Sequence, residues 1–117
     1  VLLFLPEGEF HELGLLFIQY LLKSRGVHTI YLGANVPLDD VQFVCKLKKP
    51  DFIYSHMTSV SSGFSFERFL ANMTRKLSET PIVISGRLTQ AYEKKIPSSI
   101  IFKKNLGEVM EFIGGIR

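Results

Sequence analysis

The residues of this chain that are best suited to chemistry lie in the short stretch 9–14, which reads Glu-Phe-His-Glu-Leu-Gly. A neutral imidazole such as that of His11 can ligate a metal through one ring nitrogen, and its other nitrogen then needs an acceptor that fixes the tautomer. The carboxylate of Glu9, two residues earlier, can fold back to act as that acceptor. Gly14 follows one helical turn later, where glycine costs roughly 1 kcal/mol of helix propensity, and close approach of a flat ligand would explain it. Taken alone, the pattern also fits an exposed loop histidine or a helix cap.

The elements that must position these residues alternate along the chain. Continuous apolar runs predict buried strands, whereas apolar residues at helical spacing, Gly26 as a helix end, Pro37 in a first turn and Asn105 as an N-cap predict helices. We expect strands at 1–5, 28–32, 51–55, 81–85 and 100–102, and helices at 11–25, 37–49, 65–78, 90–95 and from 105 onward. A loop of small residues, 58–63, precedes the third helix.

This alternation predicts an α/β fold, a five-stranded parallel sheet with helices on both faces, of the flavodoxin-like or Rossmann-like type. Ligands of such sheets bind beyond the carboxyl ends of the strands, at the switch point of strand order. That edge is formed by the loops after residues 5, 33, 55, 85 and 102. His11, Ser55 and Ser85 therefore all belong to the expected binding edge.

Three short motifs at matching separations carry a family resemblance. They are Glu9-x-His11-x-x-Gly14, Ser55-x-Met57 and Ser85-Gly86. In this respect the chain resembles the cobalamin-binding domain shared by methionine synthase, the B12-dependent mutases and the corrinoid methyltransferases, where the pattern is Asp-x-His-x-x-Gly, Ser-x-Leu and Gly-Gly. The match spans essentially the whole chain.

A closer resemblance is to the cobalamin-binding effector domains of MerR-type transcriptional regulators. Their first loop commonly reads Pro-x-Gly-Glu-x-His-Glu-Leu-Gly-Leu-Leu, and residues 6–16 of this chain follow that pattern. A Tyr-Leu-Gly-x-x-x-Pro-Leu-x-Asp stretch follows the second strand of those regulators, and residues 31–40 repeat it. Glu9 in place of aspartate is typical of this branch.

The resemblance implies a site in detail. His11 would replace the dimethylbenzimidazole of the cofactor as the lower ligand of cobalt, which is the base-off, His-on form, and Glu9 would accept a hydrogen bond from its far nitrogen. The displaced nucleotide tail would thread into a slot beside the first strand. The residues expected to touch the cofactor are Glu9, Phe10, His11, Gly14, Ser55, Met57, Thr58, Ser85 and Gly86. The upper ligand, whether methyl, adenosyl or hydroxyl, stays open.

Two departures from the family pattern affect the slot. Ser85 replaces the first glycine of the pair, so the slot is either tighter or gains a hydrogen bond, and Met57 replaces leucine with little change of volume. His56 could compete with His11 as the cobalt ligand. However, Ser55 is expected to face the tail, and side chains alternate along a strand, so we expect His56 to face away.

Other reactive residues have plainer interpretations. His28 precedes the second strand, at the opposite edge, and is expected at the surface. Cys45 shares the apolar side of its helix and is expected in the core. The aromatic residues Phe64, Phe66 and Phe69 are expected to pack in the core and at the helix entry.

Composition limits the class of protein. The chain has 117 residues, a net charge of +3 and one cysteine, which predict a single domain in a reducing, cytoplasmic setting. The mild basic excess lacks an aromatic-rich stripe, so we expect no direct contact of this domain with nucleic acid, and no apolar run is long enough for a membrane. The chain opens on an apolar run without an initiator Met, and we interpret it as a domain excised from a longer protein.

The function expected from these observations is that of a cobalamin-binding effector domain of a regulator, without enzyme activity of its own. Its expected partners are the helical-bundle and DNA-binding domains of the parent chain. Self-association is also expected, because the first helix is apolar nearly all round, unless the last helix covers it.

Two alternatives stay open: a degenerate domain that serves only for oligomerisation or interaction, and the corrinoid carrier of a methyltransferase. A receiver domain is disfavoured because Ser55 stands where a phosphorylatable aspartate is needed, and an electron carrier of the flavodoxin type because Glu7 and Glu9 would repel a phosphate.

Overall fold

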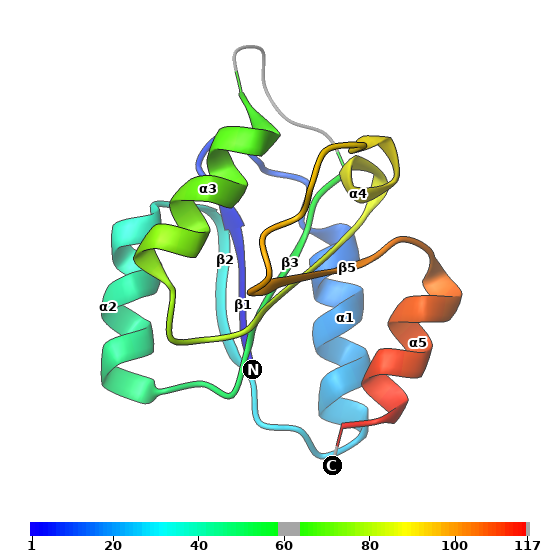
Figure 1. Ribbon diagram of the computed structural model, residues 1–117. Helices are drawn as coiled ribbons and strands as arrows, with labels where there is room; N and C mark the ends of the chain where they lie inside the picture. Colours follow the sequence, from blue (N-terminus) through cyan, green and yellow to red (C-terminus); the bar gives the residue numbers. More distant parts are fainter. Residues whose placement is uncertain (59–63, 117) are drawn as a thin grey trace.

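The computed structural model describes residues 1–58 and 64–116, and these residues form one parallel sheet flanked by helices (Figure 1). The strand order is β2-β1-β3-β4-β5, and all neighbouring strands run parallel. The α/β class expected from the sequence is confirmed. The strands are β1 (Leu2–Pro6), β2 (Ile30–Val36), β3 (Ile53–His56), β4 (Ile82–Ser85) and β5 (Ile100–Lys103).

Helices cover both faces of the sheet. They are α1 (Leu13–Ser24), α2 (Leu38–Lys48), α3 (Phe66–Lys76), α4 (Arg87–Ala91) and α5 (Leu106–Gly114). Figure 1 shows α1 and α5 on one side of the sheet and α2 and α3 on the other. The β1 strand is buried on both faces, and its residues alternate between two cores: Leu3 packs with α1 and α5, and Phe4 with α2 and α3.

The order in which strands are added to the sheet reverses at β1, since β2 lies on one side of β1 and β3 on the other. Sheets of this order bind their ligands at that switch point, beyond the carboxyl ends of the strands. The loop that leads from β1 to α1 and the end of β3 meet there. The structure thus brings these segments together at one edge, and a function at that edge stays a prediction.

Several boundaries differ from the sequence prediction, and three of them lie near the expected binding edge. The α1 helix begins at Leu13 instead of His11, so the histidine lies in the loop, and Glu12 occupies the N-cap position. The β2 strand continues past Gly33, whose φ of +88° accommodates a bend, as far as Val36. The α2 helix begins at Leu38, with Pro37 as its extended N-cap.

The short helix expected at 90–95 lies instead at Arg87–Ala91. It starts directly after Gly86, where the Leu88 N–H donates to the Met57 carbonyl and the Thr89 hydroxyl to the Gly86 carbonyl. Tyr92 then adopts an extended conformation and packs against aromatic rings of α3 and β5, which ends the helix.

The expected loop of small residues falls, apart from Thr58, on residues 59–63 and so lies outside the described residues. Within the described ranges, no helix has both the length and the apolar character needed to cross a lipid bilayer.

Candidate functional site

The loop between β1 and α1 holds a carboxylate against an imidazole. The Oε1 atom of Glu9 lies 2.8 Å from Nδ1 of His11 and also accepts the backbone N–H of His11 at 2.9 Å. Glu9 is fully buried, whereas the His11 side chain is 70% exposed. With Nδ1 directed at the carboxylate, ligation of a metal would use Nε2.

Strand β2 holds this loop in place. Asn35, in the left-handed conformation with φ of 58°, accepts the Gly8 N–H on its side-chain oxygen at 3.1 Å. Its own N–H donates to the Glu9 carbonyl at 3.2 Å. One residue before α1, the Glu12 carboxylate accepts the Tyr31 hydroxyl at 2.6 Å. Burial of Tyr31 and its bond to that carboxylate raise the pKa of the phenol far above its ordinary value. Both ends of the His11 loop are therefore tied to the neighbouring strand.

The space left by the missing side chain of Gly14 is filled by another residue of the chain. A Cβ atom placed on Gly14 would lie 2.3 Å from Cδ2 and 2.6 Å from Nε2 of His56. The sequence suggested a flat ligand as the reason for this glycine. In the structure the flat group against it is the imidazole of His56, which comes from the end of β3.

His56 is one of three polar side chains that are linked by hydrogen bonds. Its Nδ1 lies 2.7 Å from Oγ of Ser85, and the Tyr54 hydroxyl donates to the same oxygen at 2.8 Å. Burial lowers the pKa of His56, an effect that the nearby Glu9 carboxylate opposes, and burial raises the pKa of Tyr54 to about 12. Both rings are therefore neutral near pH 7. The hydrogen bond expected of Ser85 exists, and it is made to protein groups.

The two faces of β3 are occupied differently from our expectation, which placed Ser55 toward the slot and His56 away from it. His56 contacts Gly14 and shares the α1 side of the sheet with Tyr54, which packs in the core beneath α1. Strand alternation places Ser55 with Ile53, on the side of α2 and α3. A sequence shows which residues of a strand share a face, because side chains alternate. Packing decides which of the two sides of the sheet each set of residues faces.

Ser55 is fully buried, and its Oγ has no hydrogen-bond partner among the described residues. A buried polar atom without a hydrogen bond destabilises the folded chain unless a ligand or a water molecule forms that hydrogen bond. Whether it lines a ligand slot stays a prediction. Among the remaining residues expected at the site, Phe10 is 64% exposed and Thr58 is half-buried.

Gly86 is required by the approach of two backbone segments. Its φ is +105°, and a Cβ atom there would lie 2.3 Å from the carbonyl oxygen of Met57. The Met57 N–H donates to the Ser85 carbonyl at 2.8 Å, which joins the ends of β3 and β4. Met57 itself is fully buried. The Ser85-Gly86 motif thus combines a side-chain contact to His56 with a backbone crossing that only glycine allows.

An open hollow of about 630 Å³ lies beside the His11 loop. It is lined by His11, Leu13, Gly14, Leu16, Phe17 and Thr58. The outward face of α1 next to it is apolar and uncovered: Leu13 is 83% and Tyr20 67% exposed, and Leu16 and Phe17 are nearly half exposed. The alternative that α5 covers this face is wrong, because α5 packs on the buried side of α1 through Val109 and Ile113.

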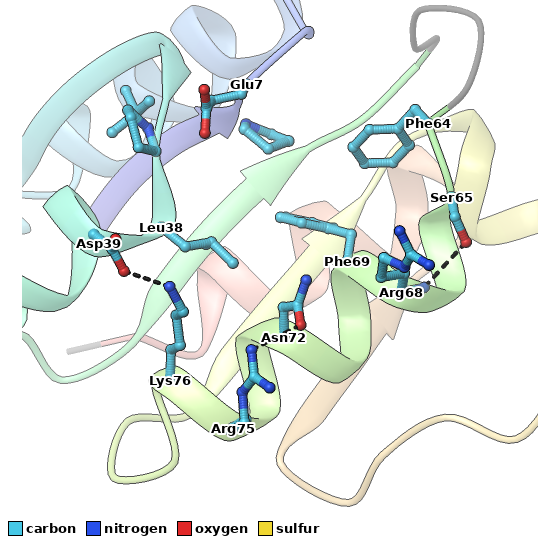
Figure 2. Close-up of a pocket in the computed structure, with 13 residues that line it drawn as sticks. Glu7, Leu38, Asp39, Phe64, Ser65, Arg68, Phe69, Asn72, Arg75 and Lys76 are labelled. Carbon is cyan, nitrogen blue, oxygen red and sulfur yellow. Dashed lines mark hydrogen bonds and ion pairs between the residues drawn. The ribbon is translucent and has the colours of Figure 1, made fainter.

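A second pocket, of about 380 Å³, lies between α2 and α3 (Figure 2). Phe64, Phe69 and Leu38 form its apolar part. Two of its three cations are engaged by protein groups: Lys76 pairs with Asp39, and Arg75 donates to Asn72. None of the residues expected to bind the cofactor lines it. The residues around the His11 loop therefore gather on the α1 side, whereas Ser55 and Met57 face the core of α2 and α3.

The remaining predictions for single residues can be compared directly. His28 is exposed before β2, as expected. Cys45 is half-buried and packs on the core of α2 and α3, and burial raises the pKa of its thiol. Phe64, Phe66 and Phe69 form an aromatic cluster on that same core. These predictions are confirmed. The three-residue chain through Tyr54 was missed, since residues 31 positions apart give no signal in one sequence.

Known proteins of the same fold bind cobalamin. The structure superposes on a chain of the methanol:cobalamin methyltransferase complex MtaBC of Methanosarcina barkeri with a TM-score of 0.71 and 17% identity, over 98% of this chain and 46% of that one. It also superposes on a cobalamin-binding protein of Desulfitobacterium hafniense DCB-2 with a TM-score of 0.61 and 16% identity, over 97% of this chain and 48% of that one. The fold is that of solved cobalamin-binding proteins, as the family resemblance predicted.

The sequence also has a relative among regulators. It is 30% identical over 95 residues to the HTH-type transcriptional repressor CarA of Myxococcus xanthus, and the match covers 81% of this chain. The chain spans about a third of the repressor, 33% of its length. No family model matches the chain. The resemblance to regulator domains, noted on the His11 loop, is thus supported by a relative over most of the chain.

Proposed function

We propose that this chain is the cobalamin-binding effector domain of a transcriptional regulator, excised from a longer protein, with His11 as the lower ligand of cobalt. The observation that carries the proposal is the Glu9–His11 pair, a buried carboxylate that orients an exposed imidazole at the ligand-binding edge of the sheet. The shared fold and the relationship to a repressor support the same assignment.

The residues at this edge fit such a cofactor. Glu9 would accept a hydrogen bond from Nδ1–H of His11, fix the ring orientation and increase the basicity of Nε2 toward a metal. The apolar hollow over Leu13, Leu16 and Phe17 suits one face of a corrin ring. When bound, the cofactor would supply a cobalt centre with an exchangeable upper ligand, whose occupancy a regulator can sense.

The nucleotide tail is assigned to the slot beside β1. Gly14 removes a side chain from its wall, and Gly86 and Met57 form the backbone crossing at its edge. The buried hydroxyl of Ser55 faces α2 and α3 and lacks a partner in the described structure, so it would bond to a polar atom of the tail only where the tail passes the end of β3. Phe10 and Thr58, beside the His11 loop, complete the proposed set.

The function of an effector domain requires a second surface. The exposed apolar face of α1 adjoins the hollow, and a neighbouring helical bundle or a second copy of the chain would cover it. We propose that the parent chain supplies this bundle together with its DNA-binding domain, and that catalysis is not a property of this domain alone.

A corrinoid carrier of a methyltransferase is the second candidate, favoured by the likeness to the MtaBC chain. The two candidates differ in what the bound cofactor does. A carrier would present the cofactor to a partner enzyme for methyl transfer, whereas an effector domain would change its association state or its contact with the neighbouring domains. Single-turnover methyl transfer measured beside sedimentation separates them.

The absorption spectrum of cobalamin bound to the chain tests the proposed ligation. The wild-type chain should show the base-off, His-on spectrum, and the His11→Ala chain should lose the protein nitrogen and shift toward the water-ligated form. His28→Ala, which changes an exposed histidine at the opposite edge, should behave as wild type. An unchanged His-on spectrum in His11→Ala would show the assignment to be wrong, and His56 would then be examined. No spectral change with any chain would favour a degenerate domain.

A further inference from the structure

His56 and Ser85 are in direct contact at the wall of the slot beside Gly14. The ring of His56 fills the space above Gly14, close enough that a single Cβ atom on that glycine would collide with it. Ser85, in place of a glycine, holds the ring by a hydrogen bond of 2.7 Å. The two residues are thus parts of one arrangement.

We propose that His56 is a plug of the tail slot: in the ligand-free chain its ring occupies the slot beside Gly14, and it must leave before the nucleotide tail of a corrinoid can enter. This inference rests on the proposed function. It deepens it by naming a residue that determines which corrinoids the domain prefers.

The plug is held by a defined network. Because the Tyr54 hydroxyl donates to Oγ of Ser85, the serine is left with its own hydrogen to donate to Nδ1 of His56. That arrangement places the ring proton of the neutral imidazole on Nε2. Tyr54 and Ser85 are both fully buried, so solvent does not compete for the contact. Breaking one such hydrogen bond changes an equilibrium constant by roughly 3- to 10-fold.

Departure of the ring has a consequence for selectivity. A corrinoid with a nucleotide tail must displace His56, whereas cobinamide has the same corrin ring but no tail base and leaves the plug in place. The plug therefore lowers the affinity for cobalamin without lowering that for cobinamide.

The plug can first be observed without any corrinoid, by NMR titration of the histidine rings. His56 should titrate below the ordinary histidine range and show a hydrogen-bonded Nδ1. Cobalamin should shift the His56 resonances, and cobinamide should leave them in place. A His56 ring that titrates in the ordinary histidine range and shows no hydrogen bond at Nδ1 in the free chain would overturn the plug, whatever the chain binds.

Binding measurements then test its role. His56→Ala and Ser85→Gly should each tighten cobalamin binding by about 3- to 10-fold and change cobinamide binding by less than about 2-fold, with His28→Ala as the matched control. Weaker cobalamin binding in both variants, or equal changes for the two corrinoids, would overturn the plug while the proposed function stands. Failure of every chain to bind either corrinoid would overturn the proposed function, and the selectivity with it. Circular dichroism of each variant establishes that it is folded.

Discussion

Helices α1 and α3 pack on opposite faces of the same sheet, yet they are built differently. In α3 the apolar residues Phe69, Leu70 and Met73 are buried, and its N-cap Ser65 accepts the Arg68 N–H. In α1 the sheet buries Leu15 and two further residues, while a second apolar row stays at the surface and no side chain caps the N-terminus. The sheet thus covers the apolar row of α3 but only one of the two apolar rows of α1. The row of α1 that stays uncovered adjoins the His11 loop.

The largest expected effect separates the two apolar rows of α1. Leu15→Ala removes a fully buried side chain and should lower the free energy of unfolding by about 2–5 kcal/mol. Leu16→Ala, at a side chain that is 45% exposed, should change it by less than about 1 kcal/mol in the isolated chain. Urea unfolding measures both. Equal losses would mean that the outward row is already buried in solution.

The next effect concerns the wall of α1 that faces His56. Gly14→Leu should expel the His56 ring, fill the slot and weaken cobalamin binding by at least about 10-fold, because a leucine side chain cannot share this space. Cobinamide should be much less affected. Gly114→Leu is the matched control, since that helical glycine has open space around it. Loss of both corrinoids in Gly14→Leu would indicate misfolding or a different pocket.

A smaller effect is expected on association. We predict that the chain self-associates through the outward face of α1 and binds cobalamin more weakly than its full-length parent. Phe17→Glu should shift sedimentation toward the monomer, and Phe43→Glu, at an exposed residue of α2, should not. A chain that is strictly monomeric and matches the affinity of its parent would contradict the prediction.

The smallest effect is a pH dependence from the α1 side. Because burial lowers the pKa of His56 in the folded chain, the unfolded chain binds more protons just below the ordinary histidine pKa of about 6.5. The stability contribution of neutral His56 is therefore complete above that pH and declines as the pH falls through it toward the folded pKa. Unfolding free energies from pH 7.5 down to pH 5 should fall more steeply for wild type than for His56→Gln. Parallel curves would show that His56 does not contribute.

The sequence alone predicted those features of the sheet and of α3 that depend on local residue patterns. Five apolar runs gave the strands, and the spacing of Phe69 and Met73 gave the buried stripe of α3. The motif separations placed Gly14, Ser55 and Ser85 at one edge. The short α4 helix was misplaced because tertiary packing of Tyr92 outweighed local propensity.

The site was less predictable where it depends on contacts between distant segments. Nothing local to His56 shows that it will meet Gly14, 42 positions earlier, or share a serine with Tyr54. The alternation of side chains along β3 correctly placed Ser55 and His56 on opposite faces. Which residue faces α1 could be seen only from the packing of that helix. A glycine in a helix indicated close approach, and only the structure identified the approaching group.

The hydrogen bonds that tie the His11 loop to β2 have a thermodynamic consequence. Ordering the backbone of a single residue costs about 1–2 kcal/mol in conformational entropy. Here the turn at Pro6, the Asn35 contacts and the Glu9 carboxylate fix the loop as the chain folds. A ligand that arrives at His11 meets a loop that is already ordered, so its intrinsic affinity is not reduced by an ordering step. Cobinamide, which needs no rearrangement of the slot, should therefore associate in one kinetic phase, and cobalamin in two.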